Sequence, residues 1–214
     1  MSFNPLTTVI ANTSVVFGNR WMSIGDDLII ADLHLGKTMH FRKAGLPIPP
    51  SARFTDQSSL LNFINVEQPK RVIILGDLFH SALNSEMKEF GMITSQFAEI
   101  DFLLIIGNHD ILSASNYRSM DLQVFEMLTI HPFLLSHEPL DSIGDGQINI
   151  HGHIHPGVLL KGRGRQSLTI PCFHLQNQRL CMPAFGTLTG LMKVKTTKKD
   201  SVFGVLENEV VQLI

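Results

Sequence analysis

Residues 27–34 read DLIIADLH, and the same pattern recurs in RVIILGDLFH (71–80), FLLIIGNHD (102–110) and INIHGHIH (148–155). Each stretch begins with an apolar, β-branched run and ends in Asp, Asn, His or Gly residues. Such runs predict buried strands of an α/β sheet. Because open α/β sheets bind ligands at the carboxyl ends of their strands, we expect the polar ends of these stretches to form the functional site.

The segments around these strands predict the rest of the fold. Helices are expected over residues 51–66, 85–99 and 115–128, so that strand and helix alternate. Short strands are expected in TSVVFGNRWMSI near the start, and SLTIPCFHL, QRLCMPAFG and VFGVLENEVVQLI predict hairpins of a second sheet. The expected fold class is α/β, with two packed sheets flanked by helices in one domain over residues 1–214.

The composition indicates the compartment. The chain has 214 residues, of which 44% are hydrophobic and 17% charged, as in ordinary globular proteins. Its first residues lack the basic and apolar regions of a signal peptide, and no apolar run reaches the roughly 18 residues of a membrane span. We therefore expect a soluble, cytoplasmic protein with no membrane partner. The net charge of -2 gives no global attraction to nucleic acid.

The polar strand ends carry side chains that bind metal ions. Period-two alternation is expected to place Asp32 and His34 on one side of the first strand, and His151, His153 and His155 on one face of the fourth. A D-x-H triplet or a single histidine belongs more often to a turn or a packed core than to a metal site. Three histidines on one face, however, pack poorly and repel one another when protonated, and metal binding removes that conflict.

The expected ligand set is larger than one tetrahedral ion needs. Two ions that share a bridging carboxylate are therefore expected, and Asp77 is assigned the bridge. Imidazole and carboxylate ligands without thiolates suit Mn²⁺, Fe or Zn²⁺. The seven expected ligands are Asp32, His34, Asp77, Asn108, His137, His153 and His155.

The motifs D-x-H, GD, GNHD, a later single His and GHxH, in that order, resemble the calcineurin-like metallophosphoesterase superfamily. The resemblance implies a four-layer αββα sandwich with two mixed sheets. It also implies that one ion takes Asp32, His34, Asp77 and His155, and that the other takes Asp77, Asn108, His137 and His153. By the same resemblance, His109 is a catalytic histidine that does not bind metal, and Asp110 lies behind it.

These roles imply a hydrolytic mechanism. Two ions would bind the phosphate oxygens and share the hydroxide that attacks phosphorus. His109 would protonate the leaving oxygen, and Asp110 would fix the orientation and tautomer of the imidazole. The expected activity is therefore metal-dependent phosphoester hydrolysis.

Three further stretches, ADLHLGKTMHFRKAGLPIP, DLFHS and MPAFGTLTGL, resemble one bacterial branch of the superfamily. Its members are the metallophosphoesterases associated with a DNA ligase and a helicase in a repair system. This resemblance implies Mn²⁺-dependent cleavage of phosphodiester bonds, including those of single-stranded nucleic acid. It also implies a functional association with the ligase and the helicase in DNA repair.

Several basic residues are candidates for substrate binding. Arg42 and Lys37 follow the first metal motif, where they would hold a phosphate or stabilise charge in the transition state; the alternative is a solvated surface loop. Two basic stretches, KGRGR (161–165) and KVKTTKK (193–199), are open to the same two interpretations. KGRGR directly follows His155, so we expect it to be the main nucleic-acid contact.

Three classes of function remain open from the sequence. A nuclease of DNA repair agrees with the branch resemblance, whereas a hydrolase of small nucleotides or of a lipid-linked pyrophosphate agrees with the near-neutral net charge. A catalytically silent scaffold is disfavoured, because scaffolds of this fold are expected to lose ligands and no ligand position is empty here. An activity screen with metal ions would separate these classes.

The two cysteines give one expectation about strand register. A two-residue turn at Gln176 and Asn177 would place Cys172 directly opposite Cys181 in an antiparallel hairpin. Both thiols are expected to stay reduced.

Overall fold

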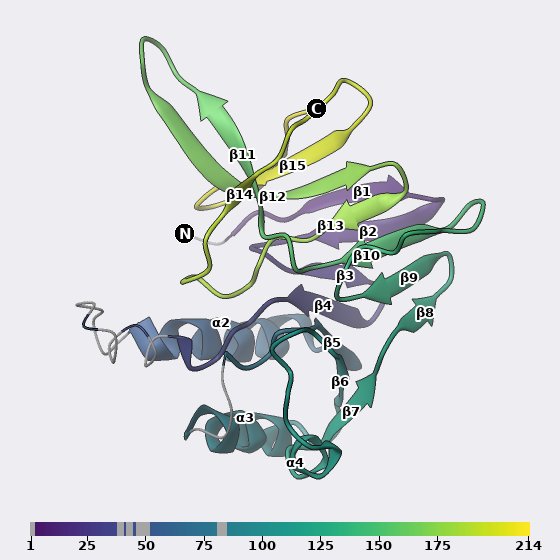
Figure 1. The fold of residues 1–214 in the computed structure, drawn as a ribbon, viewed down its shortest axis with the longest axis vertical. Coiled ribbons are helices and arrows are strands. Elements are labelled where there is room, and N and C mark those ends of the chain that lie inside the picture. The colour runs from purple at the N-terminus through teal and green to yellow at the C-terminus, as the bar shows by residue number, and fades with distance from the viewer. Residues whose placement is uncertain (1–2, 38–40, 42–44, 46–51, 81–84) are drawn as a thin grey trace.

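Two mixed β-sheets pack face to face in the computed structural model, which describes all residues except 1–2, 38–40, 42–44, 46–51 and 81–84 (Figure 1). The first sheet has seven strands in chain order, antiparallel from β1 to β4 and parallel from β4 to β7. Its strands are β1 (Leu6–Ile10), β2 (Thr13–Phe17), β3 (Met22–Ile24), β4 (Asp27–Ala31), β5 (Arg71–Leu75), β6 (Asp101–Ile105) and β7 (Leu122–Phe125).

The second sheet is built from the later part of the chain. Its order is β14-β11-β12-β13-β10-β9-β8, and β15 joins it by pairing with both β12 and β16. Its strands are β8 (Leu128–Ile130), β9 (Phe133–Ser136), β10 (Ile148–His151), β11 (Pro156–Lys161), β12 (Ser167–Gln176), β13 (Arg179–Cys181), β14 (Met192–Lys193), β15 (Ser201–Val205) and β16 (Val210–Gln212).

Within the described residues, three helices cover the outer face of the first sheet, namely α2 (Ala52–Glu67), α3 (Ser85–Gln96) and α4 (Ala114–Arg118). Alternation along β4 produces the layers: Leu28 and Ile30 pack in the cluster that holds the helices, whereas Ile29 and Ala31 pack against the second sheet. Because both faces are covered, all five residues of β4 are buried. No described helix is long and apolar enough to cross a membrane.

An aromatic group joins the two sheets. Phe17 of the first sheet stacks on Phe173 with ring centroids 4.3 Å apart, and it also contacts Phe203 at 4.8 Å. Phe17 is fully buried, and its two partners are almost so. This contact fixes how the first sheet sits on the second, and so how the loops of the two sheets meet.

Most of the expected elements are confirmed. The four stretches quoted at the start of the sequence analysis supply β4, β5, β6 and β10, and α2 and α3 begin within one residue of their expected positions. The two packed mixed sheets with flanking helices are also confirmed. In the described part of the chain, the outer face of the second sheet carries no helix and instead bears a small apolar cluster of Val158, Ile170, Cys172 and Val202.

The helix expected over residues 115–128 is wrong beyond Arg118. Ser113 caps α4 by accepting a hydrogen bond from the main chain of Asn116, but the helix ends at Arg118. The following segment forms β7, which pairs in parallel with β6. Completing the sheet at its edge therefore outweighs the helical propensity of this segment.

The expected register of the late hairpin is also wrong. Asn177 and Gln178, not Gln176 and Asn177, form the turn, and both have positive φ, at 48° and 64°. Such a turn needs left-handed residues at both central positions, and Asn accepts that conformation most readily at the first. Cys181 therefore lies opposite His174, while Cys172 pairs with Gly204 of β15. Both cysteines are free and buried.

The inter-sheet aromatic group yields the first prediction. Phe17→Ala should lower the free energy of unfolding by about 3–5 kcal/mol, because it removes a buried ring and leaves a cavity. Val9→Ala is the control, since Val9 lies on the same sheet but is 67% exposed, and it should change stability by less than about 0.5 kcal/mol. Urea denaturation measures both. Equal, small losses in the two variants would show that the aromatic group does not hold the sheets together.

Candidate metal centre

The loops that follow β4, β5 and β6 are joined by main-chain hydrogen bonds at one edge of the first sheet. The N–H of His34 donates to the carbonyl of Asp77 at 2.8 Å, and the next residue, Leu35, donates to Leu78 at the same distance. The N–H of His109, in the third loop, donates to Asp77 Oδ1 at 2.9 Å. The expected site residues of these loops therefore lie together at the carboxyl ends of the parallel strands.

The backbone at the expected ligands differs from the expectation. The strands end at Ala31 and His151, so alternation along a strand does not align the D-x-H and GHxH side chains. Instead, five of the seven expected ligands have left-handed backbones, which non-glycine residues rarely adopt. They are Asp32 (φ 52°), His34 (48°), Asp77 (51°), His153 (67°) and His155 (52°). Tight turns, not strand pleating, aim these side chains.

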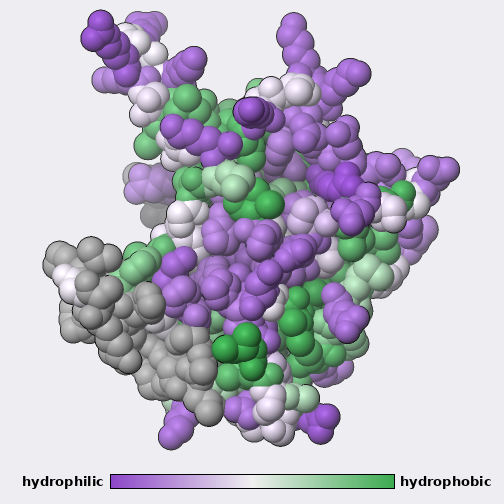
Figure 2. All heavy atoms as spheres, viewed as in Figure 1, coloured by the Kyte–Doolittle hydropathy of each residue, from purple (hydrophilic) through white to green (hydrophobic). Residues whose placement is uncertain are grey.

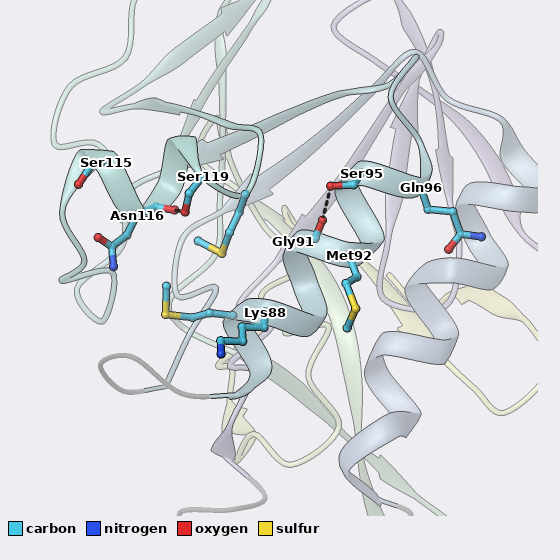
Figure 3. Close-up of a pocket in the computed structure, with 10 residues that line it drawn as sticks. Lys88, Gly91, Met92, Ser95, Gln96, Ser115, Asn116 and Ser119 are labelled. Atoms are coloured by element: carbon cyan, nitrogen blue, oxygen red, sulfur yellow. Dashed lines mark hydrogen bonds between the residues drawn. The ribbon is translucent and has the colours of Figure 1, made fainter.

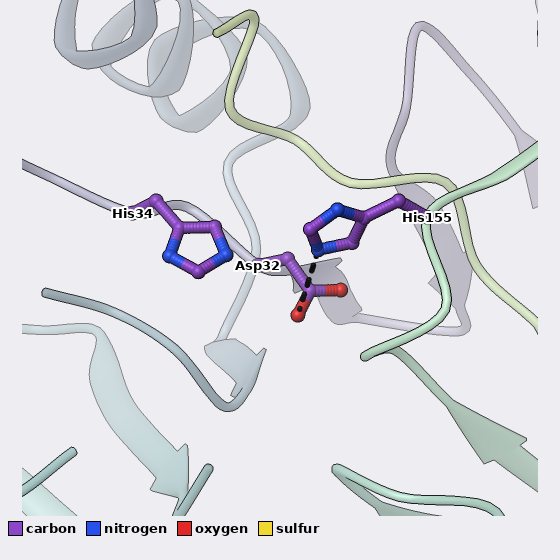
Figure 4. A group of neighbouring side chains, drawn as sticks. All are labelled: Asp32, His34 and His155. Carbon is purple, nitrogen blue, oxygen red and sulfur yellow. Dashed lines mark ion pairs between the residues drawn. The ribbon is translucent and has the colours of Figure 1, made fainter. Parts of the chain in front are cut away.

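Asp32, His34 and His155 form the first group that can hold an ion (Figure 4). Their ligand atoms lie within 4.8 Å of one another, and His155 Nε2 is 3.5 Å from Asp32 Oδ1. Metal–ligand bonds of about 2.0–2.2 Å place two ligands of one ion about 3.0–3.6 Å apart. His155 and Asp32 therefore have the spacing of two ligands on one ion.

Asp32, Asp77 and His137 form the second group. His137 Nδ1 lies 3.0 Å from the carbonyl of Leu75, and because a carbonyl can only accept, Nδ1 carries the proton. His137 Nε2 then presents its lone pair, 3.6 Å from Asp77 Oδ1. A fixed tautomer of this kind is typical of histidines that bind metal ions.

Asp77 faces both groups at once. Its Oδ2 lies 3.6 Å from Nε2 of His34, and its Oδ1 lies 3.6 Å from Nε2 of His137. Asp32 also belongs to both groups, but both of its oxygens accept the N–H of His153, at 3.2 and 2.9 Å. Asp77 thus directs one oxygen toward a histidine of each group, and its Oδ1 also accepts the N–H of His109.

His153 lies beside the second group, and Asn108 lines the same cleft as His137. His153 Nδ1 lies 3.2 Å from Nε2 of His137, again the spacing of two ligands on one ion. Asn108 is exposed, and its amide nitrogen donates to Glu138 at 2.8 Å. That bond orients the amide and leaves its oxygen as the free acceptor. Of the three histidines in HGHIHP, only His151 lies apart, with Nδ1 3.0 Å from the carbonyl of Gly152.

Buried imidazole nitrogens without partners provide the test of whether metal ions fit here. Both ring nitrogens of His34 and Nε2 of His155 are buried and have no hydrogen-bond partner. An unsatisfied buried polar atom costs about 1–3 kcal/mol, so three at one place need an explanation. Burial, followed by the charges of Lys37 and the neighbouring histidines, lowers the pKa of His34 to about 2, which keeps the ring neutral. Neutral imidazoles beside two carboxylates fit divalent cations.

Two glycines of the motifs allow the close approach of the loops. A Cβ on Gly76 would lie 2.2 Å from His137 Nδ1, and one on Gly107 would lie 2.5 Å from Asp77 Oδ1. Gly76 also has a positive φ of 70°. At Gly76 both this conformation and the close contact require glycine, whereas at Gly107 the close contact with Asp77 is the reason.

His109 and Asp110 lie beside the two groups. The exposed His109 ring stands edge-on to His34, at 5.4 Å between ring centroids, and stacks on His80 at 5.6 Å. The carboxylate of Asp110 accepts main-chain N–H groups of Leu78 at 3.0 Å and of Gly107 at 2.9 Å. Asp110 thus joins two loops of the site. Among the described contacts, none links its carboxylate to the His109 ring.

Of the two expected phosphate-binding residues, one is described. Lys37 is half-buried; burial lowers the pKa of its ammonium, while the charges of Asp77 and Asp32 raise it. Lys37 therefore lies near the two carboxylates. Arg42 lies outside the described residues.

Sequence reasoning missed two neighbours of the site, Glu138 and His80. Glu138 accepts a hydrogen bond from the Asn108 amide. The sequence feature that could have identified it is its place directly after His137. His80 lies between His109 and His34, with ring centroids 5.6 and 5.9 Å away. The sequence feature that could have identified His80 is its place three residues after Asp77, in the DLFHS stretch.

A groove lies away from the ligand cluster, between α3 and α4 (Figure 3). Its volume is about 1240 Å³, and Met87, Met92 and Met120 line it together with serine and amide side chains and Lys88. No carboxylate or histidine is among its lining residues. It therefore lacks the groups for metal or acid–base chemistry, and the candidate site remains the strand edge.

Comparisons with known proteins agree with this geometry. The model of the family described as calcineurin-like phosphoesterase matches residues 28–180. No curated protein sequence matches the chain significantly. The crystal structure of Pseudomonas putida nuclease MPE matches with a TM-score of 0.79 and 24% identity over 94% of this chain and 97% of that one. The structure of Yfce, a phosphoesterase from E. coli, matches with a TM-score of 0.48 and 11% identity over 87% of this chain and 97% of that one. The first of these structures shows the fold.

The left-handed ligands yield the second prediction. In chelator, His155→Gly should be more stable than His155→Ala by about 1 kcal/mol, because only glycine adopts a positive φ without strain. Thr129→Gly and Thr129→Ala, at an exposed position of strand β8, are the control pair and should show the usual reverse order. Thermal or urea unfolding measures all four. The same order at both positions would contradict a left-handed conformation at His155.

Proposed function

Because this chain belongs to the calcineurin-like phosphoesterase family, we propose that it is a phosphodiesterase with two divalent metal ions that acts on nucleic acid. The family match covers residues 28–180 and includes every expected ligand, and enzymes of this family are phosphoesterases that bind divalent metals. The fold and the loops of the site agree with that membership. The dinuclear centre and the substrate are our proposal.

The position of Asp77 is the observation that carries the dinuclear proposal. Its two oxygens lie 3.6 Å from imidazole nitrogens of two different histidines, His34 and His137. Asp32, His34, Asp77 and His155 would hold one ion, and Asp77, Asn108, His137 and His153 the other. The unpartnered nitrogens of His34 and His155 support the first of these sets.

Bound divalent ions would supply charge stabilisation for the phosphate and activation of a water molecule near neutral pH. Mn²⁺ is the proposed metal, since the nitrogen and oxygen ligands suit it and the resemblance to the ligase-associated branch implies it. Fe and Zn²⁺ suit the same ligands.

His109 is proposed as the general acid. Its ring is exposed and stands edge-on to His34, so it borders the ligand cluster and can reach a substrate in solvent. It would donate a proton to the leaving oxygen as the ester bond breaks. Lys37, near the carboxylates, would bind a phosphate oxygen, and Arg42 is proposed for the same role from the sequence alone.

Asp110 is proposed to act through the main chain. Both of its oxygens accept N–H groups from the loops that carry Asp77 and His109, and burial, the largest cause, raises its pKa to about 6. It would hold these loops in register rather than orient the imidazole directly. Its role is therefore positioning.

Nucleic acid is the proposed substrate class. The resemblance of residues 31–49 and 182–191 to the ligase-associated branch supports it, as does the similar fold of a protein described as a nuclease. A role in DNA repair beside a ligase and a helicase, in the cytoplasm, follows from the same resemblance. A small nucleotide substrate is the alternative, and rates on nucleotides and on single-stranded DNA distinguish the two.

Metal content yields the third prediction. The wild-type protein should bind two Mn²⁺ per chain and lose its activity in chelator. Asp77→Ala should bind neither ion, because each ion loses a ligand, whereas Asn108→Ala should keep the ion held by Asp32, His34 and His155. Elemental analysis after Mn²⁺ loading and desalting gives both stoichiometries. One ion in the wild type, or two in Asp77→Ala, would contradict the shared bridge.

The leaving group yields the fourth prediction. His109→Ala should keep both ions but lose activity by about 10²- to 10⁴-fold on a substrate with a poor leaving group, where protonation limits the rate. An activated aryl phosphodiester, whose leaving group needs no proton, should lose much less. Rates of wild type and variant on both substrates at one Mn²⁺ concentration provide the measurement. Equal losses, or an emptied metal site, would contradict the role as general acid.

A further inference from the structure

Charge is distributed very unevenly along this chain. Residues 146–206 contain eight Lys and Arg residues and one acidic residue, Asp200, while the whole chain has 17 basic and 19 acidic residues. The rest of the chain is therefore acidic, with nine basic and 18 acidic residues. The overall charge of -2 hides a strongly basic segment.

The fold gathers most of this charge on one projection. Strand β14 pairs in parallel with β11, through Pro156 with Met192 and Gly157 with Lys193, so the two basic stretches follow neighbouring strands, one from Lys161 at the end of β11 and the other from Lys193 at the end of β14. We call residues 156–170 and 192–199 the basic arm. Residues 156–170 project from the body of the molecule as the β11–β12 hairpin in Figure 1, with β14 at the base of that hairpin, and Figure 2 shows hydrophilic side chains toward its tip.

All seven cations of the basic arm are exposed, and none forms an ion pair with any residue that the structure describes. Asp200, the acidic residue beside them, is 6% exposed and accepts hydrogen bonds from Thr197 and Gln176. The positive charge of the arm is therefore free to attract an anion. The seven residues are Lys161, Arg163, Arg165, Lys193, Lys195, Lys198 and Lys199.

The arm is ordered rather than a loose tail. Val158 and Ile170 pack with Cys172 and Val202 in a separate apolar cluster, and Val194 packs against it. The 197–200 turn is held by hydrogen bonds of Thr197 to Asp200, at 2.9 Å. A fixed array of cations loses less entropy on binding than a flexible one.

The arm begins at the metal centre. Strand β11 starts directly after His155, whose carbonyl accepts the N–H of Met192 at 2.9 Å. Six residues of β11 extend about 20 Å from that point. A strand of stacked nucleotides with one phosphate per roughly 3.4 Å would present about six phosphates over this length.

The other side of the centre is acidic. A cleft beside Asn108 and His137 is lined by Glu126, Glu138 and Asp141, which repel phosphates. We infer from this polarity that a nucleic acid strand leaves the metal centre along the basic arm. This inference rests on the proposed function. Phosphates farther along the strand from the cleaved bond lie on the two basic stretches, which together form a binding site separate from the residues that hold the metal ions.

Salt dependence of binding tests the arm directly. Each phosphate contact on a single strand changes the slope of log K against log salt concentration by about 0.7. Arg163→Gln with Arg165→Gln, and Lys195→Gln with Lys198→Gln, should therefore each reduce the slope by about 1.4. They should also weaken binding by about 10- to 30-fold at 0.1 M salt. Lys88→Gln with Arg118→Gln, exposed cations on α3 and α4, is the matched control and should change neither.

Binding is measured by fluorescence anisotropy on the metal-loaded protein, with a labelled single-stranded oligonucleotide whose phosphorothioate linkages keep the charge and resist cleavage. Wild-type slopes in both arm variants, or equal losses in the control, would overturn the inference. Loss of binding to phosphatidylserine vesicles with an unchanged oligonucleotide slope would also overturn it, in favour of a membrane surface.

A small aryl phosphodiester separates this inference from the proposed function. Because it does not reach the arm, its hydrolysis by both arm variants should match that of the wild type. If the wild type hydrolyses no phosphodiester, the proposed function fails, but the oligonucleotide slopes still decide the arm. If the arm variants lose activity on the aryl diester as well, these cations act in the metal centre and the arm as a separate binding site is wrong.

Discussion

The hydrogen bonds between the loops after β4, β5 and β6 are the constraint on which the rest of the structure depends. The main chain of His34 bonds to Asp77, the main chain of His109 bonds to the Asp77 carboxylate, and Asp110 joins Leu78 to Gly107. Parallel strands bring their carboxyl ends to one edge, but the strands alone do not bring side chains within a coordination distance. The contacts between loops do so, and they need the core beneath to keep the strand ends level.

The left-handed conformations at the ligands show the energetic consequence of that arrangement. Each costs on the order of 1 kcal/mol for a residue with a Cβ, and five of them occur among the expected ligands. The unpartnered nitrogens of His34 and His155 add a further cost. The surrounding fold must offset this strain in the metal-free protein. Any cation that binds these residues only in the folded state would increase the free energy of unfolding, and more so the tighter it binds.

The sequence predicted the parts of the fold and site that depend on local patterns. Apolar runs ending in polar clusters marked β4, β5, β6 and β10, and the order of the motifs pointed to the family. It failed where conformation depends on distant contacts: alternation misplaced the geometry at Asp32 and His153, because the strands stop before those residues. Residues 122–125 form a strand because they pair with the edge of β6. The local sequence pattern does not indicate that this edge is available.

The net charge also leaves out the arrangement of the charged residues, for a related reason. A net charge of -2 argued for a small substrate, because the sum treats charges as if they lay at one point. The potential that a substrate meets depends on the nearest charges, since screening limits their reach to about 10 Å. The pairing of β11 with β14 places two stretches that lie about 30 residues apart in the sequence on the same part of the second sheet. Acidic side chains remain near Asn108 at the other end of the ligand cluster. Basic residues on one side of the ligand cluster and acidic residues on the other would orient a bound polyanion. The net charge does not show this separation, whereas the strand topology does.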